Sequence, residues 1–279
     1  MPVPTPVALI HPGSGPTDRD GNNALIPGKN DSLKLLAEGL HEQEIASLRI
    51  DKRGVGESAA AAPSETALRF ETYVADVVAW LGKLRDDERF GNLYVIGHSV
   101  GALIGMLSAE RAAVQVFVSL SGPGENAADT LRRQLGAQLS GDQLRGAEIV
   151  LAKLEAGETV APLPEAVATV PGIQNLFRPS VQPYLSSWFQ YDPAEVVARL
   201  ELPVLLVQGT HDLQVRVEDA QLLAEANPNA QLELLGGMNH ILKDAPTDPQ
   251  ANLATYSDPN LPLAPGLLST VVGFLEDVP

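Results

Sequence analysis

The sequence predicts an α/β protein built on an open, mostly parallel, doubly wound sheet with a helical insertion. Short apolar runs alternate with longer helical patterns along the 279 residues. Most of these runs lack polar alternation, which is typical of strands in a parallel sheet covered on both faces. The alternation breaks once, between residues 121 and 202, and that interval is too long for a simple crossover. We therefore expect helices on both faces of the sheet and one added helical region.

Runs rich in β-branched residues or leucine are the predicted strands, at residues 7–10, 47–50, 92–97, 114–120, 203–209 and 231–236. Helical spacing marks further segments, near residues 31–43, 66–86, 100–111, 217–226 and 265–277. In the segment 66–86, apolar side chains recur every three or four residues. Trp80 belongs to this pattern and is expected to pack in the core.

The interval 121–202 is predicted to be a helical cap, inserted between two parts of one core, residues 1–120 and 203–279. It contains several prolines and helical patterns around 127–156 and 193–200. We expect it over the carboxyl edge of the sheet, where ligands bind in open α/β folds. Its aromatic side chains suit an apolar pocket, and the candidate substrate-binding residues are Phe177, Tyr184 and Trp188. The alternative is a cap whose aromatic residues pack only on one another.

Charge and composition exclude several classes of function. The formal net charge of −16 disfavours nucleic acid and anionic membranes as partners, since both would repel the chain. Residues 90–109 carry no formal charge, but glycine and polar residues interrupt them, which indicates a buried strand and helix rather than a membrane span. The absence of cysteine excludes disulfides and a cysteine nucleophile. The first residues lack a signal-peptide pattern, so a cytoplasmic location is expected.

The pentapeptide Gly97-His98-Ser99-Val100-Gly101 lies between a predicted strand and a predicted helix. A reactive serine in this context sits on a tight, strained turn, and glycines two positions on either side let neighbouring backbones approach. The turn lifts the hydroxyl above the sheet, where the N-terminus of the following helix points at it. Ser99 is therefore the candidate nucleophile.

A serine nucleophile needs a base, and the base needs an acid that orients it. His240 follows the last predicted strand and can reach back over the sheet, so it is the candidate base. The less favoured candidates are His11, His41, His98 and His211. Asp212, just beyond a strand, fits the chain order of serine, acid and histidine. Glu125 and Asp129, after the preceding strand, are the alternative acids.

An oxyanion hole needs two backbone N–H donors aimed at the developing negative charge. Val100, which follows the nucleophile, is expected to provide one. Ser14 is expected to provide the other, from the loop "HPGSGPTDRDGN" after the first strand, with Gly13 and Gly15 shaping the turn. A phosphate-binding loop is the rival interpretation, but the sequence patterns of such loops are missing.

With these residues assigned, the chain resembles the α/β-hydrolase superfamily, and in particular serine esterases. The similar motifs are "GSGPTDRDG" at 13–21, "LRIDKRGVGES" at 48–58, "GHSVG" at 97–101, "PVLLVQGTHDLQV" at 203–215 and "NHIL" at 239–242. Two features depart from that pattern: the usual N-terminal antiparallel strands are expected to be missing, and Gly101-Ala102 replaces the common Gly-Gly after the elbow. The resemblance implies that a charged set braces the oxyanion loop, formed by Asp18, Arg19, Asp51 and Arg53; a solvated surface cluster is the alternative.

We therefore expect a serine hydrolase that cleaves small-molecule carboxylic esters with small or medium acyl groups. Ser99 would attack the acyl carbonyl, and neither a metal nor an organic cofactor would be required. Acyl transfer, thioester hydrolysis and peptide hydrolysis are alternatives, because each would use the same triad. A non-catalytic ligand-binding protein of the same fold is a further alternative, although it would not need to retain all triad members.

Overall fold

The computed structural model describes residues 4–62 and 64–277. Residues 1–3, which begin the segment without a signal-peptide pattern, lie outside these ranges. The strands form one fully parallel sheet in the order β2-β1-β3-β4-β5-β6. Every predicted apolar run forms one of its strands, which confirms the expected open sheet. The strands are β1 (Thr5–His11), β2 (Ala46–Arg49), β3 (Phe90–His98), β4 (Val116–Leu120), β5 (Val204–Gly209) and β6 (Gln231–Leu235).

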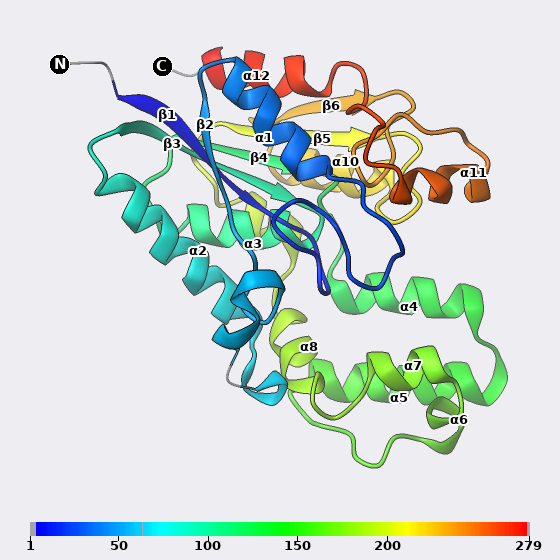
Figure 1. The fold of residues 1–279 in the computed structure, drawn as a ribbon. Coiled ribbons are helices and arrows are strands. Elements are labelled where there is room, and N and C mark those ends of the chain that lie inside the picture. The colour runs from blue at the N-terminus through cyan, green and yellow to red at the C-terminus, as the bar shows by residue number, and fades with distance from the viewer. Residues whose placement is uncertain (1–3, 63, 278–279) are drawn as a thin grey trace.

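Helices cover both faces of the sheet, as Figure 1 shows. One face packs against α1 (Ser32–Glu42) and α12 (Leu267–Asp277). The other face packs against helices from both halves of the chain, namely α2 (Phe70–Arg85), α3 (Val100–Ala109), α9 (Pro193–Val197) and α10 (Val217–Ala226). The two-sided cover confirms the doubly wound architecture.

Strand β1 shows how the apolar runs build two cores. Successive side chains of a strand point to opposite faces. Val7 and Leu9 accordingly belong to the cluster on the α2 and α3 side, and Ala8 and Ile10 belong to the cluster beneath α1 and α12. A strand buried on both faces needs no polar alternation, which accounts for the continuous apolar runs in the sequence.

Trp80 corrects one expectation. It is 40% exposed, whereas Val77 and Leu81 of the same helix are buried. The buried stripe of α2 runs through positions 70, 74, 77, 81 and 84. Trp80 lies three residues after Val77 and four before Leu84, but at about 100° per residue it falls at the edge of that stripe. Trp80 is therefore exposed and does not belong to the buried cluster on this face of the sheet.

Most of the interval between β4 and β5 folds into helices with a core of their own, whereas α9 at its end packs on the sheet. A third cluster of buried apolar residues, which runs from Ala127 to Phe189, is distinct from the two clusters on the sheet. In Figure 1 these helices lie together beyond one end of the sheet. That end is the carboxyl end, because β4 stops at Leu120 immediately before them. The helices are α4 (Ala127–Gln138), α5 (Gly141–Glu155), α6 (Glu165–Ala168), α7 (Pro171–Leu176) and α8 (Gln182–Trp188).

The remaining elements are single helical turns or short helices in the connecting segments. They are η1 (Gly56–Ala61), η2 (Glu65–Ala67), α11 (Pro249–Ala254) and η3 (Thr255–Ser257). Across residues 4–62 and 64–277, no helix combines the length and the apolar character needed to cross a bilayer.

Candidate active site

Ser99 occupies a strained turn between β3 and α3. Its φ of 55° and ψ of −130° are unusual for a residue with a side chain. A Cβ on Gly97 would collide with the carbonyl oxygen of Gly101, and a Cβ on Gly101 would lie 2.5 Å from the carbonyl oxygen of His11. Both positions therefore require glycine, and the turn holds Ser99 at the carboxyl edge of the sheet.

Val100 is the first residue of α3. The first N–H groups of an α-helix have no partner within the helix, and they carry the positive end of its dipole. The N–H of Val100 is one of these groups, and it belongs to the residue after Ser99. A negative charge that develops beside Ser99 would therefore face a donor of suitable polarity.

His240 and Asp212 come from two neighbouring loops at the same edge of the sheet. Asp212 follows β5, and His240 follows β6. His240 Nδ1 lies 2.9 Å from Asp212 Oδ2, and the carboxylate side chain is fully buried. The backbone N–H groups of Gln214 and Val215 donate to Asp212 Oδ1 at 2.8 and 2.9 Å. These two N–H groups thus hold the carboxylate in place independently of its contact with the imidazole.

The surroundings keep Asp212 ionised. Burial alone would raise the pKa of this carboxyl group, but the nearby His240 and the N–H donors of Val215 and Gln214 outweigh it and lower the pKa below its usual value. An ionised carboxylate at Nδ1 places the imidazole proton on that nitrogen. The other ring nitrogen, Nε2, is then free to accept a proton.

Ser99 and His240 line one cavity of about 850 Å³. Among the described residues, no hydrogen bond joins Ser99 Oγ to the imidazole. Catalytic hydrogen bonds are often long in the absence of substrate and tighten when it binds. In this structure the two side chains are connected by lining the same cavity.

The loop after β1 reaches Ser99 from the other side. A Cβ built on Gly13 would lie 3.1 Å from Ser99 Cβ, so the backbone of Gly13 passes close to the candidate nucleophile. Ser14 follows it, is exposed, and lines the same cavity. Gly15 has a φ of 63°, which lets the loop turn back after Ser14.

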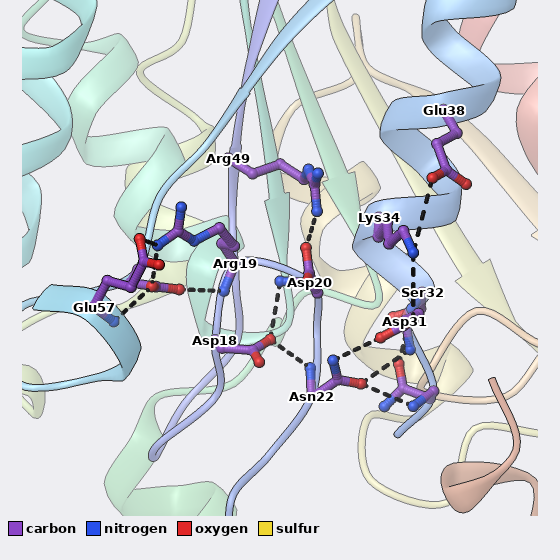
Figure 2. Close-up of polar contacts among 12 residues, drawn as sticks. Asp18, Arg19, Asp20, Asn22, Asp31, Ser32, Lys34, Glu38, Arg49 and Glu57 are labelled. Carbon is purple, nitrogen blue, oxygen red and sulfur yellow. Dashed lines mark hydrogen bonds and ion pairs between the residues drawn. The ribbon is translucent and has the colours of Figure 1, made fainter. Parts of the chain in front are cut away.

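Charged side chains hold the outer part of this loop, and Figure 2 shows many of their contacts. Arg19 pairs with Asp51 and Glu57, at 2.6 Å in each case. Asp18 Oδ1 accepts hydrogen bonds from the backbone N–H groups of Asp20 and Asn22, both at 2.9 Å. These contacts brace the loop as the sequence resemblance implied.

Arg53 differs from the other members of the charged set. Its Nε lies 2.9 Å from a carboxylate oxygen of Asp76 on α2, so it fastens the loop after β2 to that helix. The residue between Asp51 and Arg53 is Lys52, which sequence reasoning did not select. Lys52 is buried, lines the cavity, and donates to the carbonyl oxygens of Gly13 and Gly15. Burial lowers the pKa of Lys52 to about 7.

His98, considered from the sequence only as a less favoured base, has a structural contact that the sequence did not indicate. Its Nε2 donates to the backbone carbonyl oxygen of His240 at 2.7 Å, and burial lowers its pKa to about 3. The residue is therefore neutral and links the turn at Ser99 to the loop of the candidate base. Its position beside Ser99 was visible in the sequence, but its partner, far along the chain, was not.

The alternative bases and acids have other partners. His211 Nδ1 contacts the carbonyl oxygen of Ala245 at 2.6 Å, and His11 Nδ1 contacts that of Pro12 at 2.9 Å. His41 is exposed on α1. Glu125 pairs with Arg133 and Arg216, and Asp129 pairs with Arg132. Among the candidate acids, Asp212 is the one hydrogen-bonded to His240.

The helical insertion supplies one wall of the cavity. Tyr184 and Trp188 of α8 line it, together with residues of α4. Phe177 does not line it, because its side chain is fully buried in the third apolar cluster. The structure thus brings two of the three candidate substrate-binding residues to the cavity. Within the described ranges, no group of three or more His, Asp or Glu residues could hold a metal ion.

The sequence matches the profile of the family described as "Alpha/beta hydrolase family" over residues 10–254. It is 28% identical over 243 residues to the esterase EstD of Thermotoga maritima. The match covers 85% of this chain and 54% of EstD, so the chain spans about half the length of that relative.

Solved esterase structures share the fold. Esterase Pf2001 of Pyrococcus furiosus aligns with a TM-score of 0.60 and 18% identity, over 99% of this chain and 83% of that one. Est1E of Butyrivibrio proteoclasticus, solved with ferulic acid bound, aligns with a TM-score of 0.58 and 17% identity, over 98% of this chain and 91% of that one. At 17–18% identity, this similarity shows a shared fold and nothing more specific.

Proposed function

Because the chain belongs to the alpha/beta hydrolase family, we propose that it is a serine hydrolase that cleaves carboxylic esters of small or medium acyl groups. The observation that carries the proposal is the Asp212–His240 pair at the cavity into which the strained Ser99 turn opens. A buried, ionised acid, a correctly oriented imidazole and a serine at a helix N-terminus are the groups that acyl transfer needs. The similarity to EstD supports an ester as the substrate.

In the acylation step, His240 Nε2 takes the proton of Ser99 as Ser99 Oγ attacks the acyl carbon. The carbonyl oxygen becomes an oxyanion, which accepts hydrogen bonds from the N–H groups of Val100 and Ser14. Asp212 stabilises the imidazolium that forms. When the tetrahedral intermediate collapses, the ester bond breaks, and His240 gives its proton to the departing alcohol.

In the second step, His240 removes a proton from water, and the resulting hydroxide attacks the acyl-enzyme. A second oxyanion forms in the same place; as it collapses, the bond to Ser99 Oγ breaks, His240 returns its proton to Oγ, and the carboxylic acid is released. All of these proton transfers use one nitrogen atom of the base. This cycle needs no group beyond the chain's own residues and water.

The insertion 121–202 acts in this proposal as a cap that shapes the acyl pocket. Tyr184 and Trp188 would contact the acyl chain, since both line the cavity beside apolar residues of α4. An apolar wall with few polar groups selects acyl chains by size and shape. The cap would therefore set the preferred chain length without taking part in the bond-breaking steps.

The experiment that tests this proposal combines turnover with covalent labelling. A panel of chromogenic esters and thioesters, run with the wild-type protein and with Ser99→Ala, should show turnover of esters that falls about 10⁵-fold or more in the variant. A fluorophosphonate should add to Ser99 and to no other serine, because only an activated serine attacks it. Labelling at another residue, or wild-type protein that turns over no member of the panel, would falsify the proposal.

Ser14→Ala is the matched control for the serine substitution. It keeps the backbone N–H that the proposal uses and removes only a hydroxyl group. We expect most of the turnover and all of the labelling to remain. A loss of about 10²–10³-fold, the size seen when an oxyanion donor is removed elsewhere, would show that the hydroxyl of Ser14 matters.

A further inference from the structure

Lys52 is a buried lysine at the candidate active site that the proposed mechanism leaves without a role. It follows β2, which pairs with β1 in the sheet, and its side chain reaches the loop that leaves β1. Only 6% of the residue is exposed, yet it lines the same cavity as Ser14 and Ser99. A buried lysine is costly unless its ammonium group has partners, so its position demands an explanation.

The partners of Lys52 are two backbone carbonyl oxygens of the oxyanion loop. Its Nζ donates to the carbonyl oxygen of Gly13, and to that of Gly15 at 2.8 Å. Within residues 4–62 and 64–277, no ion pair joins Lys52 to a carboxylate. The neighbouring charges are used elsewhere, because Asp51 pairs with Arg19, and Arg53 pairs with Asp76.

The bond to Gly13 determines where the N–H of Ser14 points. The carbonyl group of Gly13 and the N–H of Ser14 belong to one planar peptide unit, and this peptide is trans. In a trans peptide the C=O and N–H bonds point in opposite directions. An ammonium group that holds the Gly13 oxygen therefore fixes the direction of the Ser14 N–H on the other side. A Cβ on Gly13 would lie 3.1 Å from Ser99 Cβ and 3.5 Å from Ser99 Oγ, so this peptide passes close to the candidate nucleophile.

The bond to Gly15 acts differently. The residue after Gly15 is Pro16, which has no N–H, so this peptide has no donor to aim. Its contribution is to fix the left-handed turn at Gly15 by anchoring a second point of the loop. Two anchors from one ammonium group hold the loop more firmly than one.

From these contacts we infer that Lys52 is the positioning residue of the oxyanion hole, and that it directs the N–H of Ser14 at the oxyanion. The inference rests on the proposed function, since it assigns a role in the same reaction. When protonated, the ammonium group beside the Gly13 carbonyl oxygen also polarises the peptide, which strengthens the N–H of Ser14 as a donor. Lys52 acts through the backbone and does not itself touch the substrate.

Lys52→Met tests the inference, because methionine has similar length and no donor. An oxyanion donor stabilises the transition state and not the bound ester. We expect kcat for a chromogenic ester to fall about 10–100-fold while KM stays within about threefold, since the donor is misdirected rather than deleted. Lys52→Gln, which retains one N–H donor group, should lose less, and it serves as the second variant if the methionine variant folds poorly.

A transition-state analogue gives a readout that a purely structural role would not change. A trifluoromethyl ketone adds to an activated serine and forms a tetrahedral oxyanion, whereas the corresponding secondary alcohol forms none. Lys52→Met should weaken binding of the ketone by the same factor as kcat and leave binding of the alcohol unchanged.

Lys243→Met is the matched control. Lys243 is also buried, and its Nζ donates to a backbone carbonyl oxygen, that of Leu261. Its removal should lower the melting temperature and leave the ratio of ketone to alcohol affinity unchanged. The same melting-temperature loss in both variants, with a lowered ketone affinity only in Lys52→Met, is the result that supports the inference.

Two results would overturn the inference for Lys52. One is a folded Lys52→Met protein whose kcat and ketone affinity stay within twofold of wild type. The other is a rise of KM in place of the fall in kcat, which would place Lys52 against the substrate. Wild-type turnover and fluorophosphonate labelling are measured alongside. If they are normal, only the Lys52 inference is lost; if the wild-type protein shows neither, the proposed function is lost with it.

Discussion

The imidazole of His98 donates a hydrogen bond from Nε2 to the backbone carbonyl oxygen of His240, at 2.7 Å. The residue before the candidate nucleophile is thereby joined to the candidate base itself. The two rings also lie close, with centroids 5.0 Å apart. This bond ties the turn after β3 to the loop after β6, so the relative position of Ser99 and His240 depends on a side chain that takes no part in proton transfer.

His98→Leu should lower kcat for esters by about 10–100-fold, because a displacement of about 1 Å at a reacting group can cost a factor of about 100. His98→Gln retains an N–H donor and should recover part of the loss. Steady-state kinetics on one good ester measures both effects, and fluorophosphonate labelling rates should follow them. Equal activities of the leucine and glutamine variants would show that the hydrogen bond does not position the base.

The buried histidines predict acid sensitivity. Burial lowers the pKa of His11 and of His98 from 6.5 to about 3. Between pH 6.5 and about 3, each of these histidines is protonated in the unfolded chain and neutral in the folded chain. The free energy of unfolding therefore falls as the pH falls through this window. Each histidine should contribute a slope of about 1.4 kcal/mol per pH unit.

Urea unfolding between pH 6 and 5 measures this slope, above the range in which most carboxylates titrate. His11→Gln should reduce it by about 1.4 kcal/mol per pH unit, which is the share of one histidine. His41→Gln, at an exposed position on α1, is the matched control for losing a histidine. The same slope in wild type and His11→Gln would contradict the buried, neutral state of His11.

The sheet could be predicted from the sequence because each strand has a local signal in its own residues. A strand buried on both faces is a continuous apolar run, and all the runs from residue 7 to residue 236 form strands in the structure. The pairing of Asp212 with His240 was also predictable, since parallel strands place the loops after β5 and β6 at one edge. Chain order and residue type were enough for that inference.

The contacts that escaped prediction join residues far apart in the chain. His98 and His240 are separated by 142 positions, and Lys52 lies 39 positions from Gly13. Neither contact has a local signature: nothing near His98, at the end of β3, indicates its partner, and a lysine in a loop such as Lys52 is usually exposed. The prediction for Phe177 was wrong because its local signal is ambiguous. An aromatic residue suits a pocket wall and the core of the helical insertion equally well, and the structure places Phe177 in that core.

Asp212→Asn should lower kcat by about 10³–10⁴-fold, because an amide at this position favours the wrong tautomer of the base. The substitution also disturbs a buried residue, so the melting temperature must be measured on the same protein. Glu125→Gln is the control, since Glu125 lines the cavity but pairs with Arg133 and Arg216. Near-normal turnover of Asp212→Asn with a strong loss in Glu125→Gln would transfer the acid role to Glu125.

Trp188 and Phe177 form a matched pair for testing the acyl pocket. Both are aromatic residues of the helical insertion, but Trp188 lines the cavity and Phe177 is buried away from it. The ring of Trp188 stacks on Phe70, with centroids 5.9 Å apart and planes 3° from parallel. This contact fixes the wall, so that removing the indole enlarges the cavity at a defined place.

Trp188→Ala should raise kcat/KM for an octanoyl ester relative to an acetyl ester by about 10-fold or more, because each methylene in an apolar pocket contributes about 1–3 kcal/mol to discrimination. Phe177→Ala should instead lower the free energy of unfolding by about 3–5 kcal/mol and leave the ratio of the two esters unchanged. The ratio of kcat/KM for the two p-nitrophenyl esters, measured beside a urea melt of each variant, separates pocket from packing. If Trp188→Ala scales both esters equally, the indole serves only to hold α8 on α2, and another part of the cavity wall must select the acyl chain.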